Sequence, residues 1–244
     1  MPSSTPSTGY GEAVRAHLTR LEEHNAEALD EATRLVLGCV RSGGIILTAG
    51  AGHSLAAVAE TFFRAGGLAC VRPLYHPELL PLHGARASTV AERRSGLAEQ
   101  LLTEVGMGEH DVVVVFSTSG VNPYPVEVAQ HARAAGRPVI GVTSPASTAA
   151  APRRAGSTLA EEATVVLDTL VPPGDIAYPV EAPFTAPLSS LAVMFLWNCV
   201  LVRVTERAAQ QSVELPLWRS SNVVGNDDWN AELMRRYHDR VPQL

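Results

Sequence analysis

The most constraining stretch of the sequence is GIILTAGAGHSL, which occupies residues 44–55. Its apolar, partly β-branched start is typical of a buried strand. Gly50 and Gly52 then allow a sharp turn, because glycine has no Cβ to obstruct it. The Ala-rich segment from Ser54 predicts a helix that ends at Gly66. Backbone N–H groups and a positive helix end meet at this turn, which predicts an anion site, and phosphate is the usual anion.

Composition limits the class of protein. The chain has 244 residues, 46% of them hydrophobic, which is enough for a substantial core in one domain or two. A formal net charge of −6 at pH 7 argues against nucleic acid as a partner, because a nucleic-acid binder needs a basic face. Residues 1–9 are polar and rich in Pro and Ser, which predicts disorder and no signal peptide. No uninterrupted apolar run reaches the ~18 residues that span a membrane, so we expect a soluble cytoplasmic protein.

The cysteines and histidines do not form a metal-binding pattern. Cys39, Cys70 and Cys199 lie far apart between apolar neighbours, and they are odd in number. This spacing indicates buried free thiols in a reducing compartment rather than a disulfide framework. His76 and His83 lack the HxxxH or HExxH spacing of a zinc site. We therefore expect no metal and no other cofactor.

The rest of the chain alternates helical and strand-like segments. Apolar spacing predicts helices, the first of them long and amphipathic, over residues 10–42, 54–66, 92–105, 123–135, 188–209 and 227–237. Short apolar runs predict strands over residues 45–47, 69–74, 111–116, 138–143 and 163–168. Residues 75–91 and 170–186 are rich in Pro and predict loops. The alternation indicates an α/β fold, a three-layer αβα sandwich around a five-stranded parallel sheet, with a C-terminal helical tail.

Small polar residues follow three of the predicted strands. They are Gly52, His53 and Ser54 after the first strand, Ser117, Thr118, Ser119, Gly120 and Asn122 after the Val-rich strand, and Thr143 and Ser144 after the next. Ligands of parallel α/β sheets bind at the carboxyl ends of the strands, so we expect these residues to converge. One such turn is equally typical of helix capping. Three together favour a phosphate monoester, which needs many hydrogen-bond donors, and hence a phosphorylated sugar.

The glycine turn is also partly compatible with two other chemistries. A dinucleotide-binding turn needs a third glycine where Leu55 stands and an acidic residue near Arg72. A serine hydrolase would use Ser54 as its nucleophile, with Asp175 and His238 following in the order of that class. The chain is one residue short of the GxSxG motif, and a hydrolase leaves the second hydroxyl-rich turn unexplained.

The turns GAGHS, STSGVN and VTS resemble those of the SIS (sugar isomerase) domain family of phosphosugar-binding proteins. The resemblance covers roughly residues 12–240. STSGVN is similar to the family's SxSGxT turn, with Asn122 where Thr is usual. The segments RAGGLACVRPLYHPEL, ASTVAERRSGLAEQLL, PPGD and SSNVVGNDDWN resemble a single-domain bacterial branch of the family. This resemblance implies a homodimer in which segments of one subunit, here residues 214–244, pack on the other subunit and close its site.

The resemblance also implies roles for single residues. Phosphate contacts are implied for Ser54, Ser117, Thr118, Ser119 and Asn122, and weaker substrate contacts for Gly52, Thr143 and Ser144. Family enzymes use a carboxylate beside C1 and C2 of an opened sugar 6-phosphate, and Glu92 matches the ERxxG motif of the branch. Glu92 also fits a glutamate that simply opens a helix, where the helix dipole favours it. The branch often has a second carboxylate near position 95, where this chain has Ser95.

Two further side chains have open roles. His53 has a side chain that can open a pyranose ring by proton transfer near neutral pH, or it can serve only to pack the turn. Asp175, in the PPGD segment, is expected either to hold a sugar hydroxyl or to cap a turn.

The function implied by the resemblance is an enzyme acting on N-acetylglucosamine 6-phosphate. Glu92 would remove the C2 proton and the C3 hydroxyl would leave by β-elimination, which makes the enzyme a lyase, either a dehydratase or, with a C3 ether, an etherase. An aldose–ketose isomerase is the alternative, in which the same enolate takes its proton back at C1. A non-catalytic phosphosugar sensor is a third candidate, although no basic helix-turn-helix segment precedes residue 44.

Overall fold

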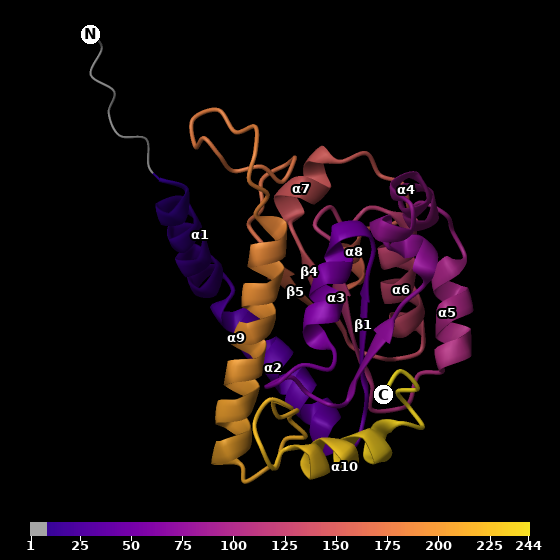
Figure 1. The fold of residues 1–244 in the computed structure, drawn as a ribbon. Coiled ribbons are helices and arrows are strands. Elements are labelled where there is room, and N and C mark those ends of the chain that lie inside the picture. Colours follow the sequence, from indigo (N-terminus) through magenta and orange to yellow (C-terminus); the bar gives the residue numbers. More distant parts are fainter. Residues whose placement is uncertain (1–8) are drawn as a thin grey trace.

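The computed structural model of the chain describes residues 9–244 and is built around one parallel sheet. The strands are β1 (Ile46–Gly50), β2 (Val71–Leu74), β3 (Val112–Phe116), β4 (Val139–Thr143) and β5 (Val165–Asp168). Their order is β2-β1-β3-β4-β5, with all neighbours parallel (Figure 1). Every residue of β1, β3 and β4 is buried, as in a sheet covered on both faces. The disorder predicted for residues 1–9 falls, apart from Gly9, on residues outside the described range.

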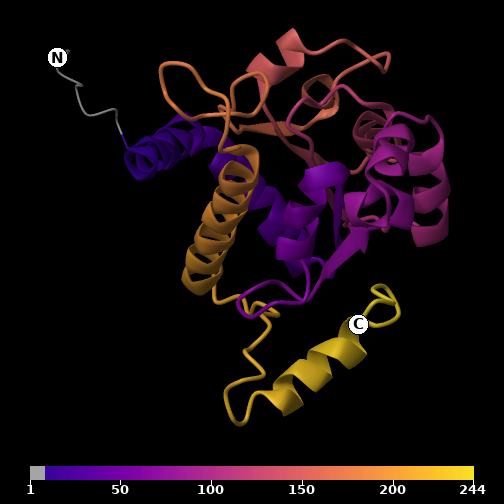
Figure 2. The same cartoon turned by 45° about the horizontal axis from the view of Figure 1, so that its top comes forward.

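Helices cover both faces of the sheet, so the three-layer α/β sandwich is confirmed. One face carries α2 and α3 with α9 outside them, and the opposite face carries α5, α6 and α8 (Figures 1 and 2). These helices are α2 (Ala26–Arg41), α3 (Leu55–Thr61), α5 (Leu97–Val105), α6 (Pro123–Ala134), α8 (Leu159–Glu162) and α9 (Ser189–Gln210). α3, which connects β1 to β2, lies on one face, and α5, α6 and α8, which lead to β3, β4 and β5, lie on the other. Crossover connections of one hand produce this division, because the chain moves one way along the sheet from β1 to β2 and the opposite way from β2 onward.

The N-terminal helix predicted over residues 10–42 is wrong in one respect, since it is two helices. α1 (Tyr10–His24) and α2 are separated at Asn25, which is buried. The Asn25 amide donates to the carbonyls of Leu21 and Asp168, and its Oδ1 accepts from the N–H of Asp168. β5 is an edge strand, so this side chain satisfies backbone groups that the sheet leaves open. The apolar periodicity continues across the break and hides it in the sequence.

The helix that follows the glycine turn is shorter than predicted. α3 ends at Thr61 rather than at Gly66. The segment after it pairs with the C-terminal part of the chain instead: the N–H of Gly66 donates to Trp218 O, and the N–H of Ala69 donates to Pro216 O. A backbone that bonds to a distant segment cannot continue a helix, because each N–H has one partner.

The region around Glu92 also differs from the prediction. Residues 85–92, predicted largely as loop, form α4 (Ala85–Glu92), so Glu92 ends a helix instead of opening one. The next helix, α5, begins only at Leu97, after Gly96 in the left-handed conformation. Two short 3₁₀ turns, η2 (Pro77–Leu79) and η3 (Pro81–His83), precede α4 and pack against it.

The tail over residues 214–244 packs on its own domain. It contains α10 (Asp227–Tyr237), which lies along the lower end of the molecule in Figure 1. Trp218, Leu233, Tyr237 and Val241 are buried in the core of the same chain. These four side chains are therefore covered by the chain itself, whereas Val223 and Val224 of the same tail are exposed. Contact of the tail with a partner subunit stays a prediction.

The longest helix, α9, has the composition of a membrane span but not its setting. It is the one helix of residues 9–244 that is long and apolar enough to cross a membrane. Ala192, Leu196, Trp197 and Val200 on one side of it are buried in the core, where α9 packs on α2 and α3. It is a core helix of a soluble α/β domain, and the cytoplasmic location stays a prediction.

The three cysteines are free, and two of them are buried as predicted. Burial raises the pKa of Cys70 to about 12 and raises that of Cys39 as well. Because the thiolate is the reactive form of cysteine, these two thiols are inert in the folded protein. Cys199, on α9, is only half-buried, which differs from the prediction.

Candidate functional site

The turn after β1 requires both of its glycines. It runs through a 3₁₀ turn, η1 (Gly52–Ser54), directly into α3. A Cβ on Gly50 would lie 2.9 Å from the carbonyl oxygen of Ser54, and Gly52 has a φ of +59°. The tight turn leaves Ser54 half-buried and His53 exposed at the carboxyl end of the strand.

The loop between β3 and α6 is held through its carbonyl groups. Thr118 O accepts from the N–H of Ser144 at 3.0 Å and from Oγ1 of Thr143 at 3.2 Å. Ser119 O accepts from Oγ1 of Thr148 at 2.7 Å. Within residues 9–244, the N–H groups of Thr118 and Ser119 have no protein acceptor. With the carbonyls of Thr118 and Ser119 bonded on one side, the loop presents unpaired N–H groups on the other, which is the geometry of an anion cradle.

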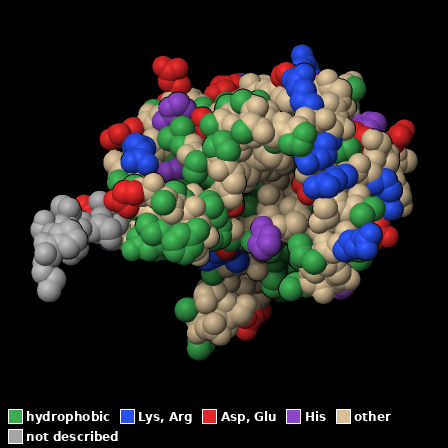
Figure 3. All heavy atoms as spheres, turned by 90° about the horizontal axis from the view of Figure 1, so that it is seen from above, with side chains coloured by type: hydrophobic (Ala, Val, Ile, Leu, Met, Phe, Trp, Pro, Cys, Tyr) green, Lys and Arg blue, Asp and Glu red, His purple; other side chains and the backbone are tan. Residues whose placement is uncertain are grey.

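Both turns open on one cavity of about 380 Å³ at the carboxyl ends of the strands. The cavity is lined by His53, Ser54, Glu92, Ser117, Thr118, Ser119, Asn122, Ser147, Ala150, Ala151, Pro173, Gly174, Asp175 and Ser189. Figure 3 looks onto this edge of the sheet: charged side chains lie mainly around its periphery, and the hollowed centre is largely backbone and small polar groups. The structure thus brings together both predicted catalytic residues and all the predicted phosphate contacts.

Thr143, Ser144 and Gly52 lie outside this lining, although weaker substrate contacts were predicted for them. The side chains of Thr143 and Ser144 are fully buried. Ser144 Oγ donates to Val171 O at 2.7 Å and accepts from the N–H of Ser147, so it caps α7 (Pro145–Ala150). These residues hold the walls of the cavity in place, and Gly52 shapes the turn.

Glu92 and His53 are the two titratable side chains of the cavity that remain unpaired. Among residues 9–244, neither forms a hydrogen bond or an ion pair, whereas the nearby Glu78 pairs with Arg94 at 2.9 Å. α4, which carries Glu92, packs against η1, which carries His53. Glu92 stands at the C-terminal end of α4, where the helix dipole disfavours a carboxylate. Its interpretation as a glutamate that stabilises the start of a helix is therefore wrong.

Asp175 lines the cavity with both of its oxygens engaged. Oδ1 accepts from the N–H groups of Leu188 and Ser189 at 3.0 and 2.8 Å, and Oδ2 accepts from the Ser189 hydroxyl at 2.5 Å. Of its two predicted roles, the structure therefore supports the cap, here at the start of α9.

The wall formed by α7 was missed in the sequence. Ser147, Ala150 and Ala151 belong to it, and its signal was Pro145 following the capping Ser144. The alternative chemistries find no support in the geometry. His238 bonds to Leu244 O, and Arg72 donates to Arg240 O; both of these carbonyls belong to the tail. Neither His238 nor Arg72 lines the cavity. Within residues 9–244, no cluster of three His, Cys, Asp or Glu is placed to hold a metal.

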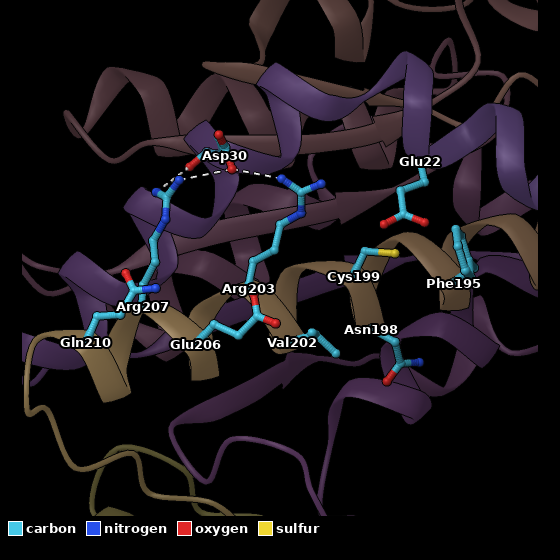
Figure 4. Close-up of a pocket in the computed structure, with 10 residues that line it drawn as sticks. All are labelled: Glu22, Asp30, Phe195, Asn198, Cys199, Val202, Arg203, Glu206, Arg207 and Gln210. Atoms are coloured by element: carbon cyan, nitrogen blue, oxygen red, sulfur yellow. Dashed lines mark hydrogen bonds and ion pairs between the residues drawn. The ribbon is translucent and has the colours of Figure 1, made fainter.

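A larger hollow, about 490 Å³, lies along α9 and faces α1 and α2 (Figure 4). Arg203 and Arg207 of α9 form ion pairs with Asp30 of α2 at 2.8 and 3.0 Å. The two guanidinium groups are therefore already engaged by a carboxylate of the same chain. Its walls are the sides of helices, which expose no free backbone N–H groups. The cavity at the strand ends is therefore the candidate functional site.

Comparison with known proteins assigns this arrangement to a class. Residues 9–144, more than half of the chain, match the SIS domain family. The class is therefore that of the SIS domain proteins. A UPF0309 protein of Streptomyces avermitilis is 36% identical over 99% of this chain and 98% of its own length. A UPF0309 protein of Geobacillus kaustophilus is 33% identical over 96% of this chain and 95% of its own length. The chain belongs to the UPF0309 family of SIS domain proteins.

Solved structures share the fold. A phosphoheptose isomerase from Neisseria gonorrhoeae has a TM-score of 0.51 and 20% identity, covering 80% of this chain and 95% of that one. A phosphoheptose isomerase from Francisella tularensis has a TM-score of 0.50 and 17% identity, covering 84% of this chain and all of that one. At this identity the likeness concerns the fold.

Proposed function

We propose that the chain is a sugar-phosphate isomerase that acts on the open-chain form of its substrate. The observation that carries this proposal is that an unpaired carboxylate, Glu92, and an unpaired imidazole, His53, line the same cavity as an anion cradle. The two solved structures of the same fold are isomerases of a sugar phosphate by name, which supports the same class of chemistry.

The proposed reaction uses these groups in sequence. The phosphate binds the Thr118 and Ser119 N–H groups and the surrounding hydroxyls, which fixes the far end of the sugar. His53 transfers a proton to open the ring, and Glu92 removes the proton from C2, which the C1 aldehyde makes acidic. The resulting enediol regains that proton at C1, while the O2 proton passes to O1, and the product is the ketose.

One free carboxylate is what this reaction needs. A single base can carry a proton from C2 to C1, and Asp175 has both oxygens engaged in its cap. The chain contains no lysine, so chemistry through a lysine Schiff base is not available to it.

Dehydration of N-acetylglucosamine 6-phosphate is the second candidate, favoured by the resemblance of Glu92 and its neighbours to the ERxxG motif. The first step is the same. An acetamido group at C2 leaves no hydroxyl there to become a ketone, so the enolate would expel the C3 hydroxyl instead. His53 would protonate that hydroxyl, which leaves as water.

The experiment that separates the candidates is incubation in D₂O with aldose 6-phosphates and N-acetylhexosamine 6-phosphates. Isomerisation gives a ketose isomer of the substrate, with deuterium at C1 to the extent that the proton on Glu92 exchanges with the solvent before its return, whereas elimination gives a product lighter by one water. Absence of both products and of deuterium at C2, with every substrate of the panel, would contradict an enzymatic function.

The role of Glu92 has a matched test. E92Q is expected to lose on the order of 10²–10⁴ in turnover while it still binds the sugar phosphate, because only the base is removed. E99Q changes an exposed glutamate on the neighbouring α5 and serves as the control. Full turnover in E92Q would remove this residue from the mechanism.

We also propose that the protein is a homodimer. α9 has a second apolar side that its own chain leaves partly uncovered, with Leu191 43% and Val202 57% exposed. Burial of such side chains against a second copy is favourable. Sedimentation equilibrium should give twice the mass of the chain, and V202R should lower it; a wild-type monomer at micromolar concentration would contradict the proposal.

A further inference from the structure

The cavity assigned to the sugar phosphate has no arginine in its lining. Its charged side chains are the carboxylates Glu92 and Asp175, and the whole chain carries a formal net charge of −6. A phosphate dianion entering this cavity meets repulsion from both carboxylates, which backbone N–H groups offset only in part. Within residues 9–244, one arginine forms a hydrogen bond to a lining residue: Arg154 Nη1 donates to Asn122 Oδ1 at 3.1 Å.

Asn122 is free to make this contact because its helix does not need it as a cap. It occupies the N-cap position of α6, yet its side chain accepts no hydrogen bond from that helix. The first turn of α6 contains Pro123 and Pro125, which have no N–H to offer. The Asn122 side chain, 7% exposed, therefore points its oxygen at the guanidinium instead.

The guanidinium fixes which end of the amide faces the ligand. Arginine can only donate hydrogen bonds, so the Asn122 oxygen must face Arg154. The Nδ2 group is left without a hydrogen bond among residues 9–244, at the wall of the cavity that Thr118 and Ser119 also line. It adds two N–H donors to the cradle, and the cation behind it makes those donors stronger.

We infer that Arg154 is a positioning and specificity residue for the phosphate group, acting through Asn122 and through its own charge. This inference rests on the proposed function of the site. It assigns to Arg154 the preference for a phosphorylated over an unphosphorylated sugar.

The neighbouring arginine provides the matched control. Arg153 and Arg154 are consecutive and both exposed, in the segment between α7 and α8. Arg153 pairs with Glu161, away from the lining of the cavity. Removal of either guanidinium changes the net charge equally, so only a local role distinguishes them.

The test compares the wild type with R154A, R154K and R153A by calorimetry, using glucose 6-phosphate, N-acetylglucosamine 6-phosphate and inorganic phosphate. R154A should bind its preferred sugar phosphate about 10–100-fold more weakly, the range of a charge-assisted hydrogen bond. R153A should bind the same sugar phosphate within about twofold of the wild-type affinity, because it breaks only an exposed ion pair, which contributes little. R154K should recover part of the loss, because it restores the charge without the planar fork.

Two readouts separate this role from a merely structural one. The dependence of the dissociation constant on salt should be shallower in R154A than in R153A, because one positive charge near the phosphate is gone. In the N122A background, R154A should have a smaller effect than in the wild type, since part of its action passes through Asn122. In the isomerase assay R154A should raise KM with little change in kcat, because it acts far from C1 and C2.

The outcomes distinguish this inference from the proposed function. A wild type that binds no sugar phosphate would contradict the proposed function and the inference with it. A wild type that binds, with R154A equal to R153A in affinity and salt dependence, would overturn the role of Arg154 and leave the proposed function standing. If R154A fails to fold, R154Q, which keeps a donor and removes the charge, is measured against the same control.

Discussion

Gly120 occupies the tightest point of the loop between β3 and α6, the proposed phosphate cradle. Its φ is +60°, and an added Cβ would lie 2.8 Å from Thr143 Oγ1. Its N–H donates to Ser117 Oγ at 3.2 Å, and its carbonyl accepts from the N–H of Leu159. A side chain here would push against the group that holds the Thr118 carbonyl, so conformation and space both require glycine.

G120A should therefore disturb the cradle itself. We expect a loss of about 1–3 kcal/mol in the free energy of unfolding and at least tenfold weaker binding of sugar phosphate. Gly136 has a similar φ of +74° but open space around its Cβ position, which makes G136A the control. The free energy of unfolding of G136A should fall by about 1 kcal/mol, and its affinity for sugar phosphate should not change. Equal affinities in the two variants would contradict the role given to the loop.

His17 makes the stability of the fold depend on pH. It is buried, and its Nε2 lies 3.1 Å from Thr169 O. Burial is the main cause that lowers its pKa below the ordinary 6.5; Arg20 also lowers it, while the bond to Thr169 and the charge of Asp168 raise it. As the pH falls, His17 therefore binds its proton at a higher pH in the unfolded chain than in the folded one. The free energy of unfolding then decreases as the pH drops below 6.5.

Urea unfolding between pH 7.5 and 5 measures this effect. The contribution of His17 to the slope is at most about 1.4 kcal/mol per pH unit. H17Q keeps a donor near Thr169 but cannot titrate, so its slope should be flatter, while H110Q at an exposed site should match the wild type. Parallel slopes in H17Q and the wild type would rule out this histidine as the source.

At the scale of elements, the strands and their polar ends could be predicted, and the helices between them only in part. β1, β3 and β4 are short apolar runs followed by small residues, and that pattern has few other structural meanings. α4 was hidden because Pro77, Pro81 and Gly84 dominate the composition around it. The match to ERxxG placed Glu92 among the site residues, yet on the wrong end of a helix.

The tail is the element whose place depends on one buried charge. Asp111 is 1% exposed and accepts from the N–H groups of Ile45 and Gly108 and from Arg240 Nη2 at 2.7 Å. Arg72 in turn donates to Arg240 O at 2.8 Å. These contacts join β2 and the starts of β1 and β3 to the segment that follows α10.

R240A should loosen this connection. We expect R240A to lower the free energy of unfolding by about 2–3 kcal/mol. This is less than the cost of breaking a fully buried ion pair, because the Arg240 side chain is partly exposed. Hydrogen exchange should quicken in α10 before it does in the sheet. R235A removes an exposed pair with Glu232 on the same helix and should cost less than about 1 kcal/mol. A stability of R240A equal to that of R235A would contradict the connection.

For the whole molecule, local patterns in the sequence predict the α/β class, because the periodicity of each segment is a local property. They do not predict contacts between distant segments. Asn25 bonds to β5, residues 66–69 pair with the tail, and Arg154 reaches Asn122, and none of these has a local signal. The meeting of the turns after β1 and β3 at one cavity was predictable because parallel strands bring their carboxyl ends to one edge.

The central claim is that the N–H groups of Thr118 and Ser119 receive the phosphate of a sugar. Amide NMR of ¹⁵N-labelled protein, titrated with a hexose 6-phosphate and then with the same hexose lacking phosphate, tests it most directly. We expect large downfield shifts of these two amide protons with the phosphorylated sugar and none with the unphosphorylated one. Shifts confined to the hollow along α9, or equal shifts with both sugars, would contradict it.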